Sequence, residues 1–269
     1  MLPENFRFTQ SNLQDFVDCE RRFQLKHLEQ RVWPAVEAEP WLARERRLEL
    51  GARFHRLVER HQLGVPVEAL SRLVENEPEL TEWWRAYLDY DELHALAGNR
   101  YPEYVLSAEL EGHRVLAKYD LLVVQPGERL VIFDWKTYRR LPGRDQLAAR
   151  IQTSLYKVLA VAAGSALFGS ELVPEQVEFV YWSPVGVVQF EYGREAFEQD
   201  RVFLVGLMDR VVGLFDWSMV LSENRCQFCE FRSYCSRGVG VGLVDDFGFL
   251  ELEEFDFLAS VGGLGVAGL

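Results

Sequence analysis

Residues 131–137 read VIFDWKT, an apolar run that ends in an aspartate and a lysine two positions apart. Its branched and aromatic side chains favour a buried strand. Residues two apart on a strand point to the same side, so Asp134 and Lys136 are predicted to share one cleft at the strand's carboxyl end. An ordinary ion pair at a strand end is the alternative, and the Asp-x-Lys pattern taken alone favours that simpler interpretation.

A second carboxylate belongs to the preceding strand. Asp120 interrupts an otherwise apolar run over residues 116–124, where a charge is costly unless it is paired or bound to a metal. Two carboxylates on neighbouring strands suit a hard cation such as Mg²⁺, which takes oxygen ligands. The lysine beside them could orient or help deprotonate a water while the metal stabilises charge developing on a phosphate.

These strands belong to an alternation of helices and strands. Helices are expected from an N-cap at Ser11 to about Gln30, over about 42–63 and over about 81–97. Strands are expected over 105–110, 114–124 and 130–135, with turns at Glu111-Gly112 and Pro126-Gly127. A helix over about 144–163, strands over about 177–182 and 186–192, and a helix over about 194–214 follow. Hairpin strands followed by a helical crossover predict an α/β core with a mixed central sheet flanked by helices.

Two helices carry further candidate residues. His55 lies above the small residues Gly51 and Ala52, which let another group approach closely. A neutral imidazole there could complete a metal shell or contact substrate, although a hydrogen-bonded structural role is commoner for a lone boundary histidine. Gln152 and Tyr156 are four residues apart on the helix after Lys136 and therefore share a face.

The composition describes a protein that can bury a full core. Of its 269 residues, 48% are hydrophobic, which is enough for one elaborated domain or two small ones. No segment resembles a signal peptide or a membrane span, so a cytoplasmic protein without membrane contact is expected. The net charge of −13 argues against non-specific coating of nucleic acid. The segment 136–157 is nevertheless basic, and its arginines are candidates for DNA-backbone contacts or for an ordinary solvated face: Arg139, Arg140, Arg144 and Arg150.

The cysteines lie at the two ends of the chain. Cys19 belongs to the first helix, whereas Cys226, Cys229 and Cys235 form a C-x2-C-x5-C run near the other end. In a reducing compartment, four such cysteines favour metal or cluster ligation over disulfides. Four thiolates suit either a structural Zn²⁺ or an iron–sulfur cluster, and ligand chemistry alone leaves both open.

The order of these motifs resembles a known family. Gly51-x3-His55, Asp120, Asp134-x-Lys136-Thr137 and Gln152-x3-Tyr156 resemble the PD-(D/E)xK nucleases of the RecB type. The opening Ser11-x-Leu13-x2-Phe16-x2-Cys19-x3-Phe23 and the closing cysteine run are similar to the iron–sulfur branch that contains AddB nuclease domains and CRISPR-associated RecB-like exonucleases. The resemblance covers about residues 8–238. It departs from the family at Ala117-Lys118-Tyr119-Asp120, where Gly-Arg-x-Asp is common, and at Glu20, where proline is frequent.

The resemblance implies a role for each motif. His55, Asp120 and Asp134 would bind Mg²⁺ or Mn²⁺ with the carbonyl of Trp135, and Lys136 would activate or position the attacking water. Gln152 and Tyr156 would contact DNA or support the site. Cys19, Cys226, Cys229 and Cys235 would hold a 4Fe–4S cluster with a structural role, Zn²⁺ being the alternative. Glu109 is considered as an auxiliary acid, with an exposed strand charge as the preferred interpretation.

The implied fold is a restriction-endonuclease-like α/β core with an N-terminal helical region and a C-terminal Fe–S segment. It would form one domain over residues 1–238, with a helical part over about 11–97, a sheet core over about 103–192 and a cysteine segment over 225–237. The acidic-aromatic stretch 239–269 would follow as an appendage. This stretch could contact a partner or mimic DNA charge, and a disordered solvating tail is the preferred alternative.

The implied activity is metal-dependent hydrolysis of DNA phosphodiester bonds, as an exonuclease on single strands or ends. The setting would be DNA repair, recombination or CRISPR adaptation. A helicase partner is conceivable, since the chain has no G-x4-G-K-[ST] phosphate loop of its own. The alternatives are a non-catalytic module that grips DNA ends or serves as a scaffold, and a redox sensor that uses the cluster.

Overall fold

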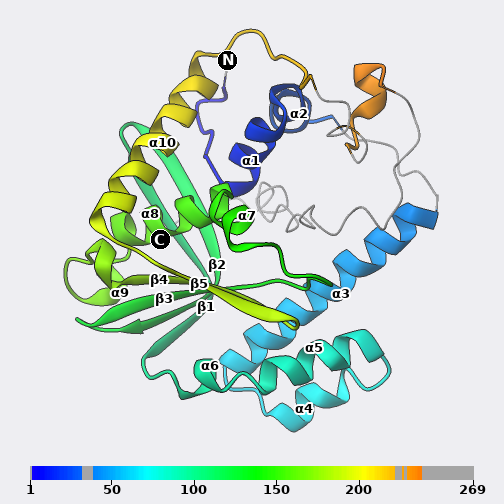
Figure 1. Ribbon diagram of the computed structural model, residues 1–269, viewed down its shortest axis with the longest axis vertical. Helices are drawn as coiled ribbons and strands as arrows, with labels where there is room; N and C mark the ends of the chain where they lie inside the picture. The colour runs from blue at the N-terminus through cyan, green and yellow to red at the C-terminus, as the bar shows by residue number, and fades with distance from the viewer. Residues whose placement is uncertain (1, 32–38, 222–225, 227–228, 238–269) are drawn as a thin grey trace, which may run out of the picture.

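The computed structural model describes residues 2–31, 39–221, 226 and 229–237 (Figure 1). The appendage expected over residues 239–269 lies outside this part of the chain. Within it, no helix combines the length and the apolar character that crossing a bilayer requires.

A mixed five-stranded sheet forms the centre of the fold. Its strands are β1 (Asn99–Leu110), β2 (His113–Gln125), β3 (Arg129–Trp135), β4 (Val177–Ser183) and β5 (Gly186–Glu191), in that spatial order. Only β3 and β4 pair in parallel, and the other neighbours are antiparallel. The parallel pair is joined by a crossover through α7 (Arg144–Ala148), α8 (Ile151–Ala163), α9 (Ser165–Phe168) and η2 (Pro174–Gln176). The predicted mixed sheet with a helical crossover is confirmed.

The hairpin between β1 and β2 fixes the register of the two strands. Glu111 and Gly112 both have positive φ, 47° and 87°, as a two-residue type I′ turn requires. Pairing then runs without a shift from Leu110↔His113 to Asn99↔Val124. β1 therefore begins at Asn99, six residues before the start at Val105 that the apolar pattern predicts.

Both faces of the central strands β2, β3 and β4 are buried, which explains why these strands are largely apolar along their length. Along β2, Leu122 and Val124 pack into one core, whereas Leu121 and Val123 pack into the other. The first core is covered by α1 (Gln10–Asp18), α8 and α10 (Arg194–Gly213). The second is covered by α3 (Glu39–Gln62), α4 (Val67–Arg72), α5 (Pro78–Leu88) and α6 (Asp91–Ala95), which lie on the opposite side of the sheet in Figure 1.

The N-terminal helical region differs from the prediction of one helix from Ser11 to about Gln30. Thr9, not Ser11, is the N-cap, because its side chain accepts the Asn12 amide while Asn12 accepts the Thr9 amide. The helix also stops at Cys19, whose backbone is extended (φ −166°, ψ 116°). The chain then resumes as α2 (Glu20–Phe23) and η1 (Gln24–Leu28).

Two other predicted helices are divided as well. The stretch predicted as 81–97 forms α5 and α6, and the stretch predicted as 144–163 divides between α7 and α8 at Arg150, which is extended (φ −76°, ψ 141°). Thr153 donates its hydroxyl to the Leu147 carbonyl across that break, which satisfies a backbone group that a continuous helix would have paired. The cysteine segment contains the short helix η4 (Arg232–Cys235).

Candidate active site and cysteine pocket

Three elements bring a histidine and two carboxylates together. One ligand atom each from His55 on α3, Glu103 on β1 and Asp120 on β2 lie within 4.8 Å of one another. His55 Nδ1 is 3.3 Å from one Asp120 oxygen, and the other Asp120 oxygen accepts the Trp135 amide at 2.7 Å. An imidazole nitrogen and carboxylate oxygens form a donor set that suits a divalent cation.

The charges around these carboxylates shift their pKa values in opposite directions. Burial raises the pKa of Asp120, but the charge and hydrogen bond of His55, the charge of Lys136 and the Trp135 amide together hold it below its usual value. Burial and the neighbouring Asp120 raise the pKa of Glu103, and its ion pair with Lys118 offsets only part of that rise. Two adjacent carboxylates that resist ionising together are a favourable place for a cation.

Asp134 and Lys136 stand beside this group, and their side chains meet on one side, as the strand periodicity predicts. Asp134 is fully buried at the end of β3, and one of its oxygens is 3.0 Å from Lys136 Nζ. Its other oxygen accepts a hydrogen bond of 2.6 Å from Gln152 Nε2 on α8. The Lys136 amide donates to the Trp182 carbonyl at 2.8 Å, which continues the pairing of β3 with β4. The Asp134–Lys136 ion pair therefore exists, and it lies next to the His55 group.

Tyr156 supports the same region from inside the core. Its hydroxyl donates to the Lys118 carbonyl at 2.8 Å, and its own carbonyl accepts the Tyr119 hydroxyl at 2.9 Å. The two rings lie 4.7 Å apart between centroids. These contacts hold the part of β2 that carries Asp120. Gln152 and Tyr156 thus share a helix face, as predicted, and both are buried against the site.

Glu103 is the site residue that sequence reasoning missed. It lies outside the predicted strand and has a φ of 52°, which is uncommon for glutamate. Pro102↔Leu121 and Tyr104↔Tyr119 pair on either side of it, so Glu103 faces Asp120 across the hairpin. Glu109, considered as an auxiliary acid, is exposed, which agrees with the preferred interpretation.

The candidate DNA-binding arginines differ in their surroundings. Arg139 and Arg140 are exposed just after β3, and Arg150 is half-buried at the start of α8. Arg144 donates to the Gln189 carbonyl and lies 4.5 Å from the Phe190 ring centroid, so it packs on β5.

The sequence model of the PD-(D/E)XK nuclease superfamily matches residues 7–236. The chain belongs to this superfamily.

Two solved structures are distantly similar to this superfamily member. The crystal structure of SSO0001 has a TM-score of 0.45 and 15% identity, with 89% of this chain and 90% of that chain covered. The crystal structure of a candidate exonuclease from Eubacterium rectale has a TM-score of 0.47 and 13% identity, with 98% and 99% covered. No curated protein matches the sequence.

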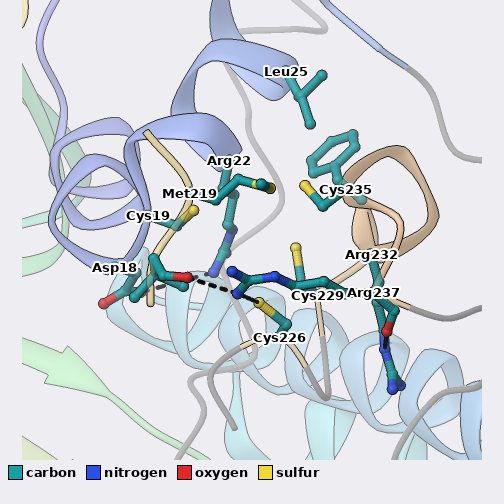
Figure 2. A pocket seen from close by; sticks show the side chains of 12 residues that line it. Asp18, Cys19, Arg22, Leu25, Met219, Cys226, Cys229, Arg232, Cys235 and Arg237 are labelled. Atoms are coloured by element: carbon teal, nitrogen blue, oxygen red, sulfur yellow. Dashed lines mark hydrogen bonds and ion pairs between the residues drawn. The ribbon is translucent and has the colours of Figure 1, made fainter. Parts of the chain in front are cut away.

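The nuclease-superfamily fold brings all four cysteines to one pocket. Cys19, Cys226, Cys229 and Cys235 line a cavity of about 240 Å³, and Figure 2 shows them gathered around it with three arginines. None of the four forms a disulfide. Burial raises the pKa of Cys229 to about 11. A buried thiolate of this kind needs positive charge close to it.

Arginines supply positive charge around the pocket. Arg237 Nη1 lies 3.1 Å from the Cys226 sulfur, and it also donates to the Val220 carbonyl at 2.6 Å. Arg22 enters from α2, and its charge opposes the rise in the pKa of Cys229. The pocket therefore suits a metal centre whose complex with the four thiolates carries a net negative charge, which the arginines would balance.

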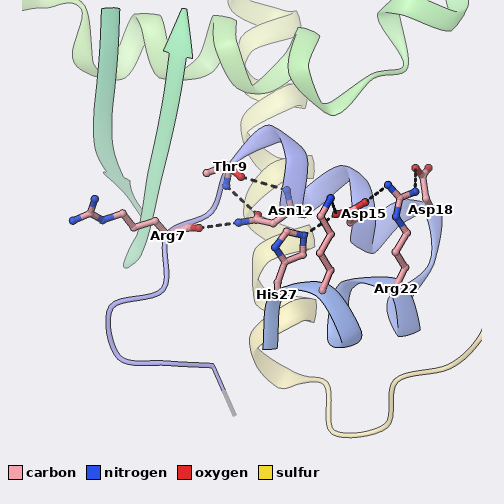
Figure 3. A network of polar contacts seen from close by, with 8 residues as sticks. Arg7, Thr9, Asn12, Asp15, Asp18, Arg22 and His27 are labelled. Carbon is pink, nitrogen blue, oxygen red and sulfur yellow. Dashed lines mark hydrogen bonds and ion pairs between the residues drawn. The ribbon is translucent and has the colours of Figure 1, made fainter. Parts of the chain in front are cut away.

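Arg22 is fixed by a buried carboxylate (Figure 3). Asp15 on α1 is fully buried, and its oxygens contact Arg22 at 2.6 Å, His27 at 2.7 Å and Lys26 at 3.2 Å. Burial alone would raise the pKa of Asp15, but these three bases together hold it well below its usual value. The Asp15 carbonyl accepts the Cys19 amide at 2.9 Å. One residue thus orients Arg22 and anchors the backbone at Cys19.

Proposed function

We propose that the chain is a metal-dependent DNA nuclease that hydrolyses phosphodiester bonds, acting on single strands or DNA ends. The observation that carries this proposal is the meeting of His55, Glu103 and Asp120 beside the Asp134–Lys136 pair, in a chain of the PD-(D/E)XK nuclease superfamily. The proposed domain spans residues 1–238.

The donor set fits Mg²⁺ or Mn²⁺. His55, Asp120 and Asp134 with the Trp135 carbonyl would hold the cation, and we add Glu103 because its carboxylate lies within the same group. A cation bound there would stabilise the negative charge that develops on the phosphate during hydrolysis.

The residues of the chain itself prepare the site for this reaction. The Trp135 amide and His55 orient Asp120, while Gln152 orients Asp134. Lys136 would orient the attacking water or take its proton, since its ammonium lies at the cleft beside Asp134. Groups fixed in this way need little reorganisation when the phosphate enters.

The experiment is an anaerobic assay on 5′- and 3′-labelled single- and double-stranded DNA with Mg²⁺, Mn²⁺ or chelator. Cleavage is expected only with a divalent cation, and Asp134→Ala and Lys136→Ala should each abolish it. Glu109→Ala, an exposed change on β1, is the matched control and should keep wild-type activity. Cleavage by a purified Asp134 or Lys136 variant would contradict the proposal. DNA binding without hydrolysis in any cation would instead support a non-catalytic end-binding or scaffold module.

We also propose that the four cysteines hold a 4Fe–4S cluster, as in the RecB-like iron–sulfur branch. What supports this proposal is that all four cysteines line one pocket. Four cysteines are the ligand set of a 4Fe–4S cluster, and structural zinc, which also takes four thiolates, is the alternative.

The cluster proposal is tested on anaerobically purified protein. Brown colour, visible absorption and about four iron atoms per chain are expected from the ligand set. A colourless protein that contains zinc would contradict the cluster. The proposed setting is DNA repair, recombination or CRISPR adaptation, and pull-downs against a helicase or an adaptation protein would test it.

A further inference from the structure

One face of α3 lies beside Thr137, in the segment that follows β3. Arg47, Gly51 and His55 are spaced four residues apart and so share that face. His55 contacts Asp120, and a Cβ on Gly51 would lie 3.5 Å from the Thr137 hydroxyl. Arg47 Nη2 donates to the Thr137 carbonyl at 2.9 Å. Arg47 therefore stands beside the residue that follows Lys136, about 12 Å along the helix from His55.

The charge at this position is only partly balanced. The Arg47 guanidinium has five N–H donors, and within the described residues one of them has an acceptor while no carboxylate lies within ion-pair distance. Arg139 follows Thr137 by two residues and is exposed. Burial and then the charge of Arg139 lower the pKa of Arg47, and Glu79 offsets part of this. The neighbouring Arg46, by contrast, lies 3.7 Å from Glu77.

We propose that Arg47 and Arg139 bind a backbone phosphate of the nucleic acid that flanks the cleaved bond. This proposal rests on the proposed nuclease function and adds a second anchoring point for the strand. An anion bound beside Thr137 would pair with both positive charges and use the N–H donors of Arg47 that have no acceptor within the described residues. Because Arg47 also holds Thr137, a phosphate bound there would fix the segment that carries Lys136. Phosphate contacts of this kind set the position of the strand and carry no sequence preference.

The test measures binding separately from cleavage. A fluorescent single-stranded oligonucleotide is titrated in chelator at several salt concentrations, and the slope of log K against log salt is compared between variants. Arg47→Ala and Arg139→Ala should each weaken binding several-fold and reduce the slope by about 0.7 per lost phosphate contact. Arg47→Lys should keep the slope because it keeps the charge. Arg46→Ala is the matched control and should change neither quantity.

The outcomes separate this proposal from the nuclease proposal. Arg47 could instead serve only to hold Thr137 in place. In that case Arg47→Ala will slow cleavage without changing the salt slope of binding, and Arg139→Ala will have no effect on either. That result overturns the phosphate site. Arg139→Ala is the safer variant, because the Arg139 side chain is exposed and makes no hydrogen bond or ion pair within the described residues. If the wild-type protein cleaves no DNA but the slopes change as expected, the phosphate site stands while the nuclease proposal fails.

Discussion

Asp134 has both oxygens engaged inside the protein, one by Lys136 and one by Gln152. The Gln152 side-chain oxygen, Oε1, has no hydrogen-bond partner within the described residues, although the side chain is almost fully buried. The amide therefore has one specific task in this surrounding, which is to orient Asp134. Tyr156 on the same helix face has a different task, because its hydroxyl bonds the backbone of β2.

These two tasks predict different consequences of substitution. Gln152→Leu should lower kcat about ten-fold or more with little change in KM, since Asp134 loses its orienting donor while substrate contacts remain. Tyr156→Phe should keep kcat and lower the free energy of unfolding by about 1 kcal/mol, the usual loss for one hydrogen bond. Steady-state kinetics and urea unfolding measure both. Equal losses of kcat in the two variants would contradict this division.

Glu103 offers a second test, with Glu109 on the same strand as its matched control. Glu103→Gln should raise the Mn²⁺ concentration needed for half-maximal binding about ten-fold or more, because a charged ligand is replaced by a neutral one. Glu109→Gln should leave it unchanged, since Glu109 is exposed away from the group. Isothermal titration with Mn²⁺ gives the affinity without substrate. An unchanged affinity in Glu103→Gln would remove Glu103 from the ligand set.

The sequence predicts most of the residues that lie together here and misses Glu103 for a clear reason. Strand periodicity places Asp134 beside Lys136, and Asp120 stands out as a charge in an apolar strand, while their roles at a metal site come from the family resemblance. Glu103 could have been found from the Glu111-Gly112 turn, because a two-residue hairpin loop fixes which residue faces Asp120. The apolar pattern instead starts the strand at Val105, since residues 99–104 are polar, aromatic or proline. The register of the hairpin places Glu103 opposite Asp120, and the hydrophobic pattern does not show this.

Among the helices, the break at Cys19 is not predicted from local helix propensity. Residues 10–28 have an apolar periodicity that predicts one helix, and no glycine or proline interrupts it. The break lets residues after Cys19 contact α1. Asp15 on α1 forms ion pairs with Arg22, Lys26 and His27, which follow the break. The extended residue turns the chain and places the Cys19 thiol at the pocket. The apolar pattern of one helix does not indicate ion pairs of this kind between two helices.

Removing the Asp15 charge should therefore weaken the whole N-terminal region. Asp15→Asn is expected to lower the free energy of unfolding by about 3 kcal/mol at pH 7, because Arg22 and Lys26 lose their buried partner. The folded-state pKa of Asp15 lies below its ordinary value of 3.8. Its contribution to stability is therefore present above pH 3.8 and is lost as the pH falls towards the folded-state pKa. Urea unfolding at pH 7 and pH 3 should show a smaller difference between variant and wild type at pH 3.

Asp18→Asn is the control for this prediction. Asp18 lies 3.8 Å from Arg22 and is partly exposed, so its loss should cost well under 1 kcal/mol. A pH-independent difference for Asp15→Asn would contradict the electrostatic explanation.

Across the whole molecule, the two ends of the chain meet through ordinary packing as well as through cysteines. The Arg21 amide donates to the Ser218 carbonyl at 3.1 Å, and the Phe23 and Trp217 rings stack at 5.4 Å. The cysteine pattern predicts that the ends meet, and the structure agrees. The stacking of Trp217 could not be predicted, because no periodic pattern connects a single tryptophan to a helix nearly 200 residues away.

The proposed cluster would add to this packing, and a double-mutant cycle can separate the two contributions. Cys19→Ser and Cys235→Ser come from opposite ends, and each should remove the cluster absorption and lower the Tm by a similar amount. The double variant should be no less stable than either single one, since the second substitution acts on a cluster already lost. Trp217→Ala should lower the Tm while the absorption stays, because it removes packing only. Additive losses in the cysteine cycle would mean that the two residues stabilise the ends independently, without a shared group.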